Sequence, residues 1–365
     1  MSEWQTFCLK DLGKIVGGAT PSTNNPKNYG NKIAWITPKD LSTLQGHYIK
    51  KGSRSISRLG FKSCSCVLLP KHAILFSSRA PIGYVAIAKK RLCTNQGFKS
   101  IIPNKKIYFE FLYYLLKYHK DSISNIGGGT TFKEVSGATL GLFKVKIPPT
   151  YYEQQKIART LSILDQKIEN NHKINELLHT LAYKIYEYYF KYKPKNAKLE
   201  QIIIENPKSS IMVKNAQKTQ DKYPFFTSGD NILFYPKAII DGRNCFLNTG
   251  GNAGIKFYVG KASYSTDTWC ICANEFSDYL YLLLSSIKIH INQSFFQGTS
   301  LKHLQKNLLK KYPIYMPSAH EIKKFNQIIM PLLTLISINT RTSKKLEQIR
   351  DFLLPLLLKQ QVKPQ

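Results

Sequence analysis

The chain has 365 residues, and its 53 lysines and arginines against 22 aspartates and glutamates give a formal net charge of +31. Hydrophobic residues make up 43% of the sequence and aromatic residues 12%, which is enough for packed cores, so a disordered chain is excluded and two or three domains are expected. A positive excess of this size argues against a neutral metabolic enzyme and favours a polyanionic partner, either nucleic acid or an acidic membrane surface.

The apolar segments of the sequence are too short to span a membrane, which argues against the membrane alternative. A spanning helix needs about 20 consecutive apolar residues, and the most apolar stretches, residues 328–338 and 352–358, are shorter and each contain a proline. Met1-Ser2-Glu3-Trp4 has neither a basic region nor an apolar core, so we expect no secretory signal, a cytoplasmic location and no membrane partner. The seven cysteines are predicted to be reduced thiols packed as small apolar side chains.

Charge and pattern divide the chain into four segments. Residues 1–149 form a first globular block with a net charge of +17, and residues 150–195 a first long helix with +3. Residues 196–317 form a second globular block with +6, and residues 318–365 a second long helix with +5. Most of the positive charge therefore lies on the first globular block.

Both globular blocks are predicted to have an α+β fold. In the first, β-branched and aromatic runs at 33–37, 67–69 and 84–88 alternate with glycine turns and precede a helical stretch at 108–119. In the second, the predicted strands 244–247 and 269–272 precede a helical stretch at 278–287.

A capping box begins each long helix. Pro149-Thr150-x-x-Glu153 and Pro317-Ser318-x-x-Glu321 lie 168 residues apart, and each places a hydroxyl three residues before a glutamate. Behind each box, apolar residues recur at alternating spacings of four and three, which is typical of a coiled-coil seam. Helices of about 40 residues would be roughly 60 Å long. Pro331 predicts a bend or a late start in the second helix.

Two asparagines lie near the centres of these helices. If the helices pack antiparallel with matched centres, Asn171 and Asn339 would meet across the seam and fix its register. Alternatively, the two side chains lie on solvated flanks and are unrelated.

The repeat extends into the globular blocks. Residues 129–133 correspond to 298–302, residues 79–83 to 250–254, and residues 94–96 to 265–267. The chain is therefore predicted to be globule, long helix, globule, long helix.

These residues resemble a known family. The run from Pro148 to Ala158, continuing from Leu161 to Glu169, resembles the spacer region of type I restriction-modification specificity subunits. Ser-Arg-Ala-Pro-Ile-Gly at 78–83 and Thr-Asn-Gln-Gly-Phe at 94–98 are similar to motifs of that family's target recognition domains. The second half departs from the pattern, since Ile322 replaces the glutamine after Glu321 and no aspartate matches Asp165.

The resemblance implies a non-catalytic DNA-recognition subunit. Two target recognition domains would each read one half of a split site in double-stranded DNA, and the long helices would pack as an antiparallel coiled coil that sets the gap. The implied partners are two methylation subunits and restriction/translocase subunits. S-adenosylmethionine, ATP and Mg would bind those partners, with no cofactor or metal on this chain. The alternatives are a related system with a fused methyltransferase-nuclease partner and a stand-alone DNA-binding regulator.

The enzyme motifs considered are incomplete in this sequence, so no catalytic residue is predicted on this chain. Pro148-Pro149-Thr150-Tyr151 is similar to an adenine methyltransferase motif, but Ile147 stands where that motif needs Asp or Asn. The glycines of residues 250–254 precede no helical pattern, and Gly260-Lys261 lacks the rest of a phosphate-binding loop.

Candidate DNA-binding residues come from the repeated loops. The Arg79 guanidinium can donate paired hydrogen bonds to O6 and N7 of a guanine, or else it contacts a phosphate or a carboxylate. Asn95 and Gln96 carry amides that suit adenine, or else stabilise a turn. The run Gly127-Gly128-Gly129-Thr130-Thr131, followed by Lys133, offers backbone N–H groups and two hydroxyls that suit a phosphate, or else it is a flexible hinge before the first long helix. The remaining candidates of the first block are Lys99, Thr130, Thr131 and Lys133. Those of the second block, which rest on the repeat alone, are Thr227, Asn252, Lys256, Thr266, Thr299, Ser300 and Lys302.

Overall fold

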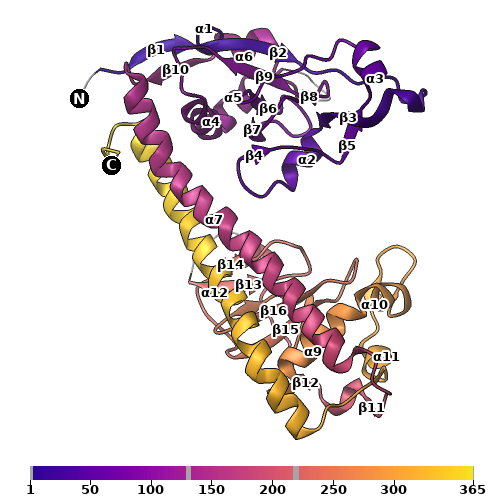
Figure 1. The fold of residues 1–365 in the computed structure, drawn as a ribbon. Helices are drawn as coiled ribbons and strands as arrows, with labels where there is room; N and C mark the ends of the chain where they lie inside the picture. Colours follow the sequence, from indigo (N-terminus) through magenta and orange to yellow (C-terminus); the bar gives the residue numbers. More distant parts are fainter. Residues whose placement is uncertain (1–2, 129–132, 217–221, 365) are drawn as a thin grey trace. The chain divides into compact units, whose positions relative to one another are not determined.

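The computed structural model describes residues 3–128, 133–216 and 222–364, which form two compact units (Figure 1). Unit 1 comprises Met1–Asn170 and Lys344–Gln365, and unit 2 comprises Asn171–Ser343. Each unit therefore combines one globular block with a part of both long helices.

The described residues of unit 1 form three small sheets. Their strand orders are β2-β9-β6-β7-β4, β5-β3-β8 and β1-β10. Most neighbours are antiparallel, but β4 pairs with β7 and β3 with β8 in parallel. The strands are β1 (Gln5–Cys8), β2 (Gly13–Gly17), β3 (Tyr29–Ile36), β4 (Tyr48–Ile49), β5 (Arg54–Ile56), β6 (Ile74–Phe76), β7 (Val85–Ala88), β8 (Cys93–Thr94), β9 (Lys99–Pro103) and β10 (Lys144–Ile147). The helices of the globular block are α1 (Leu9–Leu12), α2 (Pro38–Ser42), α3 (Arg58–Lys62), α4 (Phe109–Tyr118), α5 (Lys120–Asn125) and α6 (Gly137–Leu142).

Helix α4 occupies the core of unit 1. All six residues from Phe111 to Leu116 are buried, because the helix is apolar on every side. It packs against β6 and β7 (Figure 1) and shares a hydrophobic cluster with both long helices. The long-helix members of that cluster are Ile157, Ala158, Leu161, Leu354, Leu357 and Leu358.

Unit 2 repeats this plan with different strand lengths. Its sheets have the orders β12-β18-β15-β16, β14-β13-β17, β11-β21 and β19-β20, and β13 pairs with β17 in parallel. The strands are β11 (Ala197–Lys198), β12 (Ile204–Glu205), β13 (Tyr223–Phe226), β14 (Leu233–Tyr235), β15 (Arg243–Asn248), β16 (Ile255–Val259), β17 (Ser263–Tyr264), β18 (Thr268–Cys272), β19 (Phe296–Gln297), β20 (His303–Leu304) and β21 (Pro313–Ile314). The helices of this globular block are α8 (Val213–Ala216), α9 (Ser277–Ser286), α10 (Lys288–Ser294) and α11 (Lys306–Lys310).

Helix α9 is the counterpart of α4. Its residues from Ser277 to Leu284 are all buried, and it packs against β15 and β16. The cluster around it again includes both long helices, through Ala182, Tyr186, Phe190, Ile322, Phe325, Ile329, Leu333 and Ile336. The predicted α+β fold and the predicted internal repeat are confirmed.

One predicted strand is wrong. Residues 67–69 form no strand, and only Leu69 makes an isolated bridge, to Leu92. The next residue is Pro70, which lacks the N–H that a continuing ladder requires.

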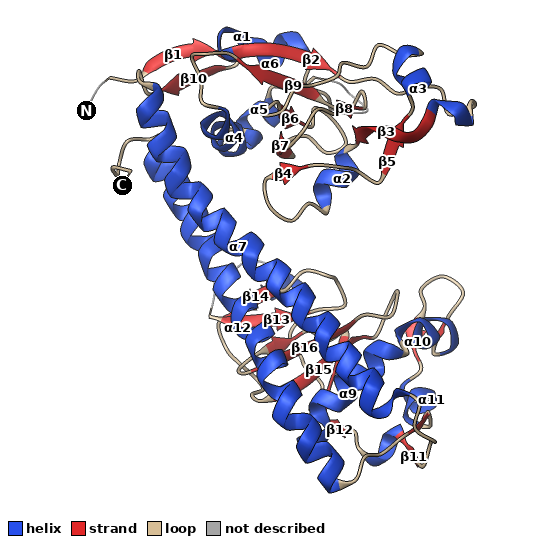
Figure 2. Cartoon of the chain, in the orientation of Figure 1, coloured by secondary structure: helices blue, strands red, loops and turns tan. Residues whose placement is uncertain are grey.

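The two long helices are α7 (Tyr151–Tyr186), which continues as a π-helical turn at Glu187–Lys191, and α12 (Ala319–Leu358). In each unit, segments of the two helices lie side by side and antiparallel (Figure 2). Both capping hydroxyls accept the expected backbone hydrogen bond, from Glu153 N to Thr150 Oγ1 at 3.2 Å and from Glu321 N to Ser318 Oγ at 3.4 Å.

Pro331 neither delays nor interrupts α12. The helix begins at Ala319 and runs through the proline. Arg243 from β15 donates to the carbonyl of Met330 at 3.3 Å and to Thr334 Oγ1 at 3.0 Å, so a side chain from the globular block holds the turn around Pro331.

The predicted pairing of Asn171 with Asn339 is wrong by one helical turn. Asn339 instead donates to Asn175 Oδ1 at 2.9 Å, and Asn171 donates to Ser343 Oγ at 3.2 Å. The prediction assumed matched helix centres, whereas the two helices pack with an offset of one turn from that arrangement. Asparagines do lie at the seam, each half-buried.

Candidate nucleic-acid interface

Three loops of unit 1 meet at one place, which we call the unit 1 loop junction (residues 77–83, 95–98 and 133–135). Ser78 is its hub, since Ser78 N donates to the carbonyl of Gly97 at 2.8 Å and the Ser78 carbonyl accepts from Val135 N at 3.0 Å. Ser78 itself is fully buried. The structure thus brings together three segments that the sequence marked separately.

Arg79 lies next to this hub and forms an ion pair. Its Nη1 is 3.6 Å from a carboxylate oxygen of Glu134, and the Arg79 side chain remains 38% exposed. The same carboxylate is 3.3 Å from Lys99 Nζ. The contact of Arg79 with a carboxylate is therefore formed, and part of its side chain remains exposed to solvent.

The loop at residues 95–98 is organised by turn chemistry. Asn95 Oδ1 accepts from Gly97 N at 3.0 Å, an arrangement that asparagine favours in turns. Gly97 fits because a Cβ there would lie 3.0 Å from both Asn95 Oδ1 and Pro38 Cγ. Gln96 is exposed, and its Oε1 accepts a hydrogen bond from Thr20.

Lys133 is exposed and lines an open hollow of about 580 Å³ with Arg79, Pro81, Ile82 and Glu134. The candidates Thr130 and Thr131 lie outside the described residues. Among the described residues on either side of them, Gly128 and Glu134 are joined by paired backbone hydrogen bonds of 2.9 and 3.1 Å. Their proposed grip on a phosphate stays a prediction.

Unit 2 has an equivalent feature, the unit 2 loop junction (residues 248–254, 265–268 and 302–304). Thr249 is its hub, since Thr249 N donates to the carbonyl of Asp267 at 3.2 Å and the Thr249 carbonyl accepts from Leu304 N at 3.0 Å. These two bonds reproduce those of Ser78. The structure therefore repeats both the folds and this junction.

Two of the unit 2 candidates, Thr227 and Lys256, form hydrogen bonds within the protein. Thr227 is buried, and its hydroxyl accepts from Gly229 N at 3.0 Å. Lys256 is half-buried and donates to the carbonyl of Thr227 at 2.7 Å and to Asn248 Oδ1 at 3.3 Å. Burial lowers the pKa of the Lys256 ammonium below its ordinary value. The Lys256 ammonium thus stabilises the unit 2 loop junction through hydrogen bonds within the protein.

The other unit 2 candidates are at the surface: Asn252, Thr266, Thr299, Ser300 and Lys302. The Lys302 carbonyl accepts from Gly251 N at 2.9 Å, which fixes the end of the 298–302 turn. Gly298 has a φ of +143°, and a Cβ there would lie 2.4 Å from the carbonyl of Leu301, so glycine is required at this position.

Sequence reasoning missed the residues that build the junctions. Ser78 and Thr249 are the hubs, and Glu134 is the anion between two cations. Glu134 directly follows the candidate Lys133 in the sequence, but a carboxylate is not a residue type that contacts DNA phosphates.

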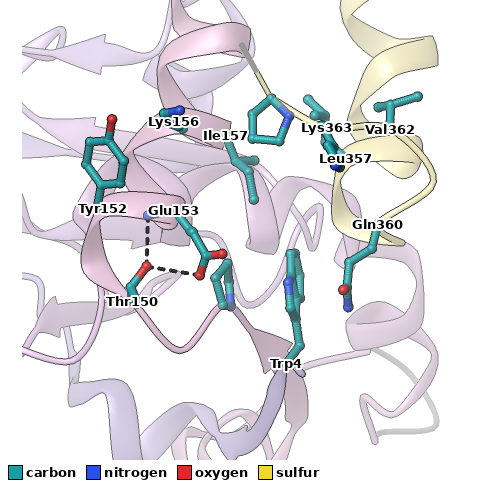
Figure 3. Close-up of a pocket in the computed structure, with 12 residues that line it drawn as sticks. Trp4, Thr150, Tyr152, Glu153, Lys156, Ile157, Leu357, Gln360, Val362 and Lys363 are labelled. Atoms are coloured by element: carbon teal, nitrogen blue, oxygen red, sulfur yellow. Dashed lines mark hydrogen bonds between the residues drawn. The ribbon is translucent and has the colours of Figure 1, made fainter. Parts of the chain in front are cut away.

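A second surface of unit 1 lies at the start of α7. A pocket of about 520 Å³ is lined by Trp4, by Tyr152, Lys156 and Ile157 of α7, and by residues of α12 and the segment after it. Figure 3 shows Trp4, Gln360 and Val362 around the first turn of α7, with Thr150 and Glu153 joined by the capping hydrogen bonds. Tyr152 is 64% exposed.

Next to this pocket, the Gln154 side chain connects α7 to the globular block by hydrogen bonds. The side chain is buried, and it accepts from Tyr108 N at 2.7 Å and donates to the carbonyl of Lys106 at 3.0 Å. In unit 2 the buried Ile322 takes the corresponding place and packs in the hydrophobic cluster.

Two repeated α+β globules, each with one loop junction and each completed by segments of two antiparallel helices, define a protein of two similar modules. The sequence comparison gives the family: the model of the type I restriction modification DNA specificity domain matches residues 1–180 and 195–348. The chain belongs to the family of type I restriction-modification specificity subunits.

Individual relatives agree with this assignment. The type I restriction enzyme MjaIX specificity subunit of Methanocaldococcus jannaschii is 33% identical over 403 residues, covering 98% of this chain and 93% of the relative. The HindI specificity subunit of Haemophilus influenzae is 30% identical over 177 residues, covering 46% of this chain and 37% of the relative. The crystal structure of the S subunit of a type I restriction-modification system from M. genitalium has the same fold, with a TM-score of 0.64 at 18% identity, covering 97% of this chain and 96% of that chain.

Among the helices in the described part of the chain, none is both long enough and apolar enough to span a membrane.

Proposed function

We propose that this chain reads a bipartite target in double-stranded DNA, with one loop junction on each half. The observation that carries the proposal is the repetition of the junction in both units, with the same pair of hub hydrogen bonds. Amides, hydroxyls and cations exposed on loops are the groups that read base edges and hold phosphates.

The spacing between the half-sites is assigned to α7 and α12. Helices of 36 and 40 residues are roughly 54 and 60 Å long at about 1.5 Å per residue. A turn of B-DNA is about 34 Å, so helices of this length can set a fixed spacing between half-sites.

Partner docking is assigned to exposed aromatic residues near the ends of α7. In unit 1 these are Tyr151 and Tyr152, 45% and 64% exposed, beside the pocket of Figure 3. In unit 2 they are Tyr188 and Tyr192, 86% and 83% exposed. Exposed aromatic residues are enriched at protein interfaces, and a repeated chain offers two such surfaces, which supports two methylation subunits.

In this proposal the chain is non-catalytic. Methyl transfer with S-adenosylmethionine, and restriction with ATP and Mg, take place on the methylation and restriction subunits. Measurement of the mass of the purified complex should give one copy of this chain with two methylation subunits.

Methylome sequencing of a host with and without this chain tests the proposal. A split adenine motif that disappears on deletion is expected, and it would give both half-sites and their spacing. An unchanged methylome, or methylation of DNA by the purified chain alone, would show the proposal to be wrong.

A further inference from the structure

Glu134 is a carboxylate at a surface proposed to face phosphates. Its side chain is 36% exposed and lies between Arg79 and Lys99. An anion at such a surface opposes binding to a polyanion, so its presence at the unit 1 loop junction needs a local explanation.

Backbone hydrogen bonds connect the segments that carry Glu134 and Arg79. Glu134 is fixed by its paired hydrogen bonds with Gly128, and its neighbour Val135 donates to Ser78, the residue before Arg79. The carboxylate and the guanidinium are therefore anchored on either side of a single backbone hydrogen bond of 3.0 Å. The ion pair of 3.6 Å between them joins two side chains whose backbones are already in place.

We propose that Glu134 is a positioning residue that orients the Arg79 guanidinium for reading a guanine edge. This inference rests on the proposed DNA-recognition function. A free arginine side chain samples many rotamers, and holding it in one arrangement removes part of the entropy lost on binding. Lys99, 3.3 Å from the same carboxylate, offsets its negative charge and reduces its repulsion of phosphates.

The unit 2 loop junction differs at the same two places. The residue after the hub Thr249 is Gly250, where unit 1 has Arg79, and the residue before Leu304 is His303, where unit 1 has Glu134. Gly250 and His303 form a β-bridge. The positioned arginine thus belongs to unit 1, and loss of Glu134 should alter one half of the motif only.

The test is methylome sequencing of hosts that carry the full-length wild-type chain or single variants of it. The wild-type motif, compared with a deletion strain, first decides whether the chain directs methylation at a split site. Glu134→Gln and Arg79→Ala are then compared at sites with one altered base pair in either half. Glu176→Gln, which removes one exposed carboxylate from α7, is the matched control.

We expect Glu134→Gln and Arg79→Ala to relax the same position of the same half, with discrimination there falling about tenfold or more. The control should keep the wild-type motif, and Glu134→Asp should retain the preference. An unchanged motif in Glu134→Gln, or a partial loss of methylation that is spread evenly over both halves, would overturn the inference while leaving the split motif of the wild type intact. If Glu134→Gln abolishes methylation, restoration by Glu134→Asp supports the inference and failure to restore overturns it.

Discussion

At the scale of single residues, a buried charge in unit 1 links the globular block to both long helices. Asp165 on α7 is 5% exposed and accepts from Tyr114 Oη on α4 and from Arg350 Nη1 on α12, both at 2.6 Å. Burial opposes the charge of Arg350, but Asp165 outweighs this effect and raises the pKa of the guanidinium. Burial raises the pKa of the Tyr114 hydroxyl, which therefore stays protonated and donates to Asp165.

Arg350→Met should destabilise unit 1 strongly. The substitution leaves Asp165 buried without its cation, and such a loss costs about 3 kcal/mol or more. Urea unfolding of the full chain measures the difference, and Arg91→Met, at an exposed arginine of the same unit, is the control. Equal unfolding midpoints for the two variants would contradict the role given to this ion pair.

The capping glutamate of α12 should make stability depend on pH. Hydrogen bonding from Ser318 N, followed by that from Tyr315 Oη, lowers the pKa of Glu321 from 4.5 to about 2. Because the pKa is lower in the folded chain, Glu321 adds stability above about pH 4.5, and this contribution is lost as the pH falls through about 2. Glu321→Gln should thus be less stable than wild type at pH 7, and the difference should shrink toward pH 2. Thermal unfolding across this range checks the trend, and a difference that does not vary with pH would contradict it.

At the scale of elements, polar side chains set the register of the two long helices in unit 2. Asn175 accepts from Asn339, while its own amide donates to the carbonyl of Ile336 at 3.3 Å. A shift by one turn would leave these half-buried amides without their partners, whereas the leucines and isoleucines around them tolerate several registers.

Replacing Asn175 and Asn339 together with leucine should raise stability but loosen the register. Cysteine pairs report the register: a pair at positions 171 and 343 matches the observed arrangement, and a pair at 171 and 339 matches a shift by one turn. In the wild-type background we expect crosslinking of the first pair, and in the double-leucine background a gain by the second. Crosslinking that is confined to the first pair in both backgrounds would show that the amides do not set the register.

At the scale of the whole molecule, the charge is unevenly divided between the globules. Residues 1–149 carry +17 and residues 196–317 carry +6, although both present a junction of the same design. Because lysines and arginines near DNA release counterions, the two modules should differ in the electrostatic part of binding.

The half-site read by residues 1–149 should show the steeper salt dependence. Each further phosphate contact adds about 0.9 to the slope of log K against log salt. Binding of the full chain is measured on duplexes that keep only one half-site, the first being identified by its response to Arg79→Ala. Equal slopes for the two duplexes would mean that net charge does not report on phosphate contacts here.

The sequence predicted the features that depend on local pattern. Thr150 with Glu153 and Ser318 with Glu321 determine where α7 and α12 begin, and the apolar run of residues 108–119 predicts α4, because caps and periodicity act within a few residues. The register was missed because Asn171 and Asn175 both fit the seam pattern, and only their hydrogen-bond partners on the other helix distinguish between them. The ion pairs of Glu134 were missed because they join it to Arg79 and Lys99, 55 and 35 residues away in the sequence.

The assembly of unit 1 from distant segments affects its synthesis. The cluster around α4 is completed by Leu354, Leu357 and Leu358, nearly 200 residues after the apolar face of α7 that they cover. A nascent chain makes the globular block first, at roughly 5 to 20 residues per second. Ile157 and Leu161 therefore stay uncovered on the ribosome for about 10 to 40 seconds, until the end of α12 emerges. During this interval the chain has the exposed apolar surface that chaperones bind, and unit 1 becomes complete only after all of unit 2 has been synthesised.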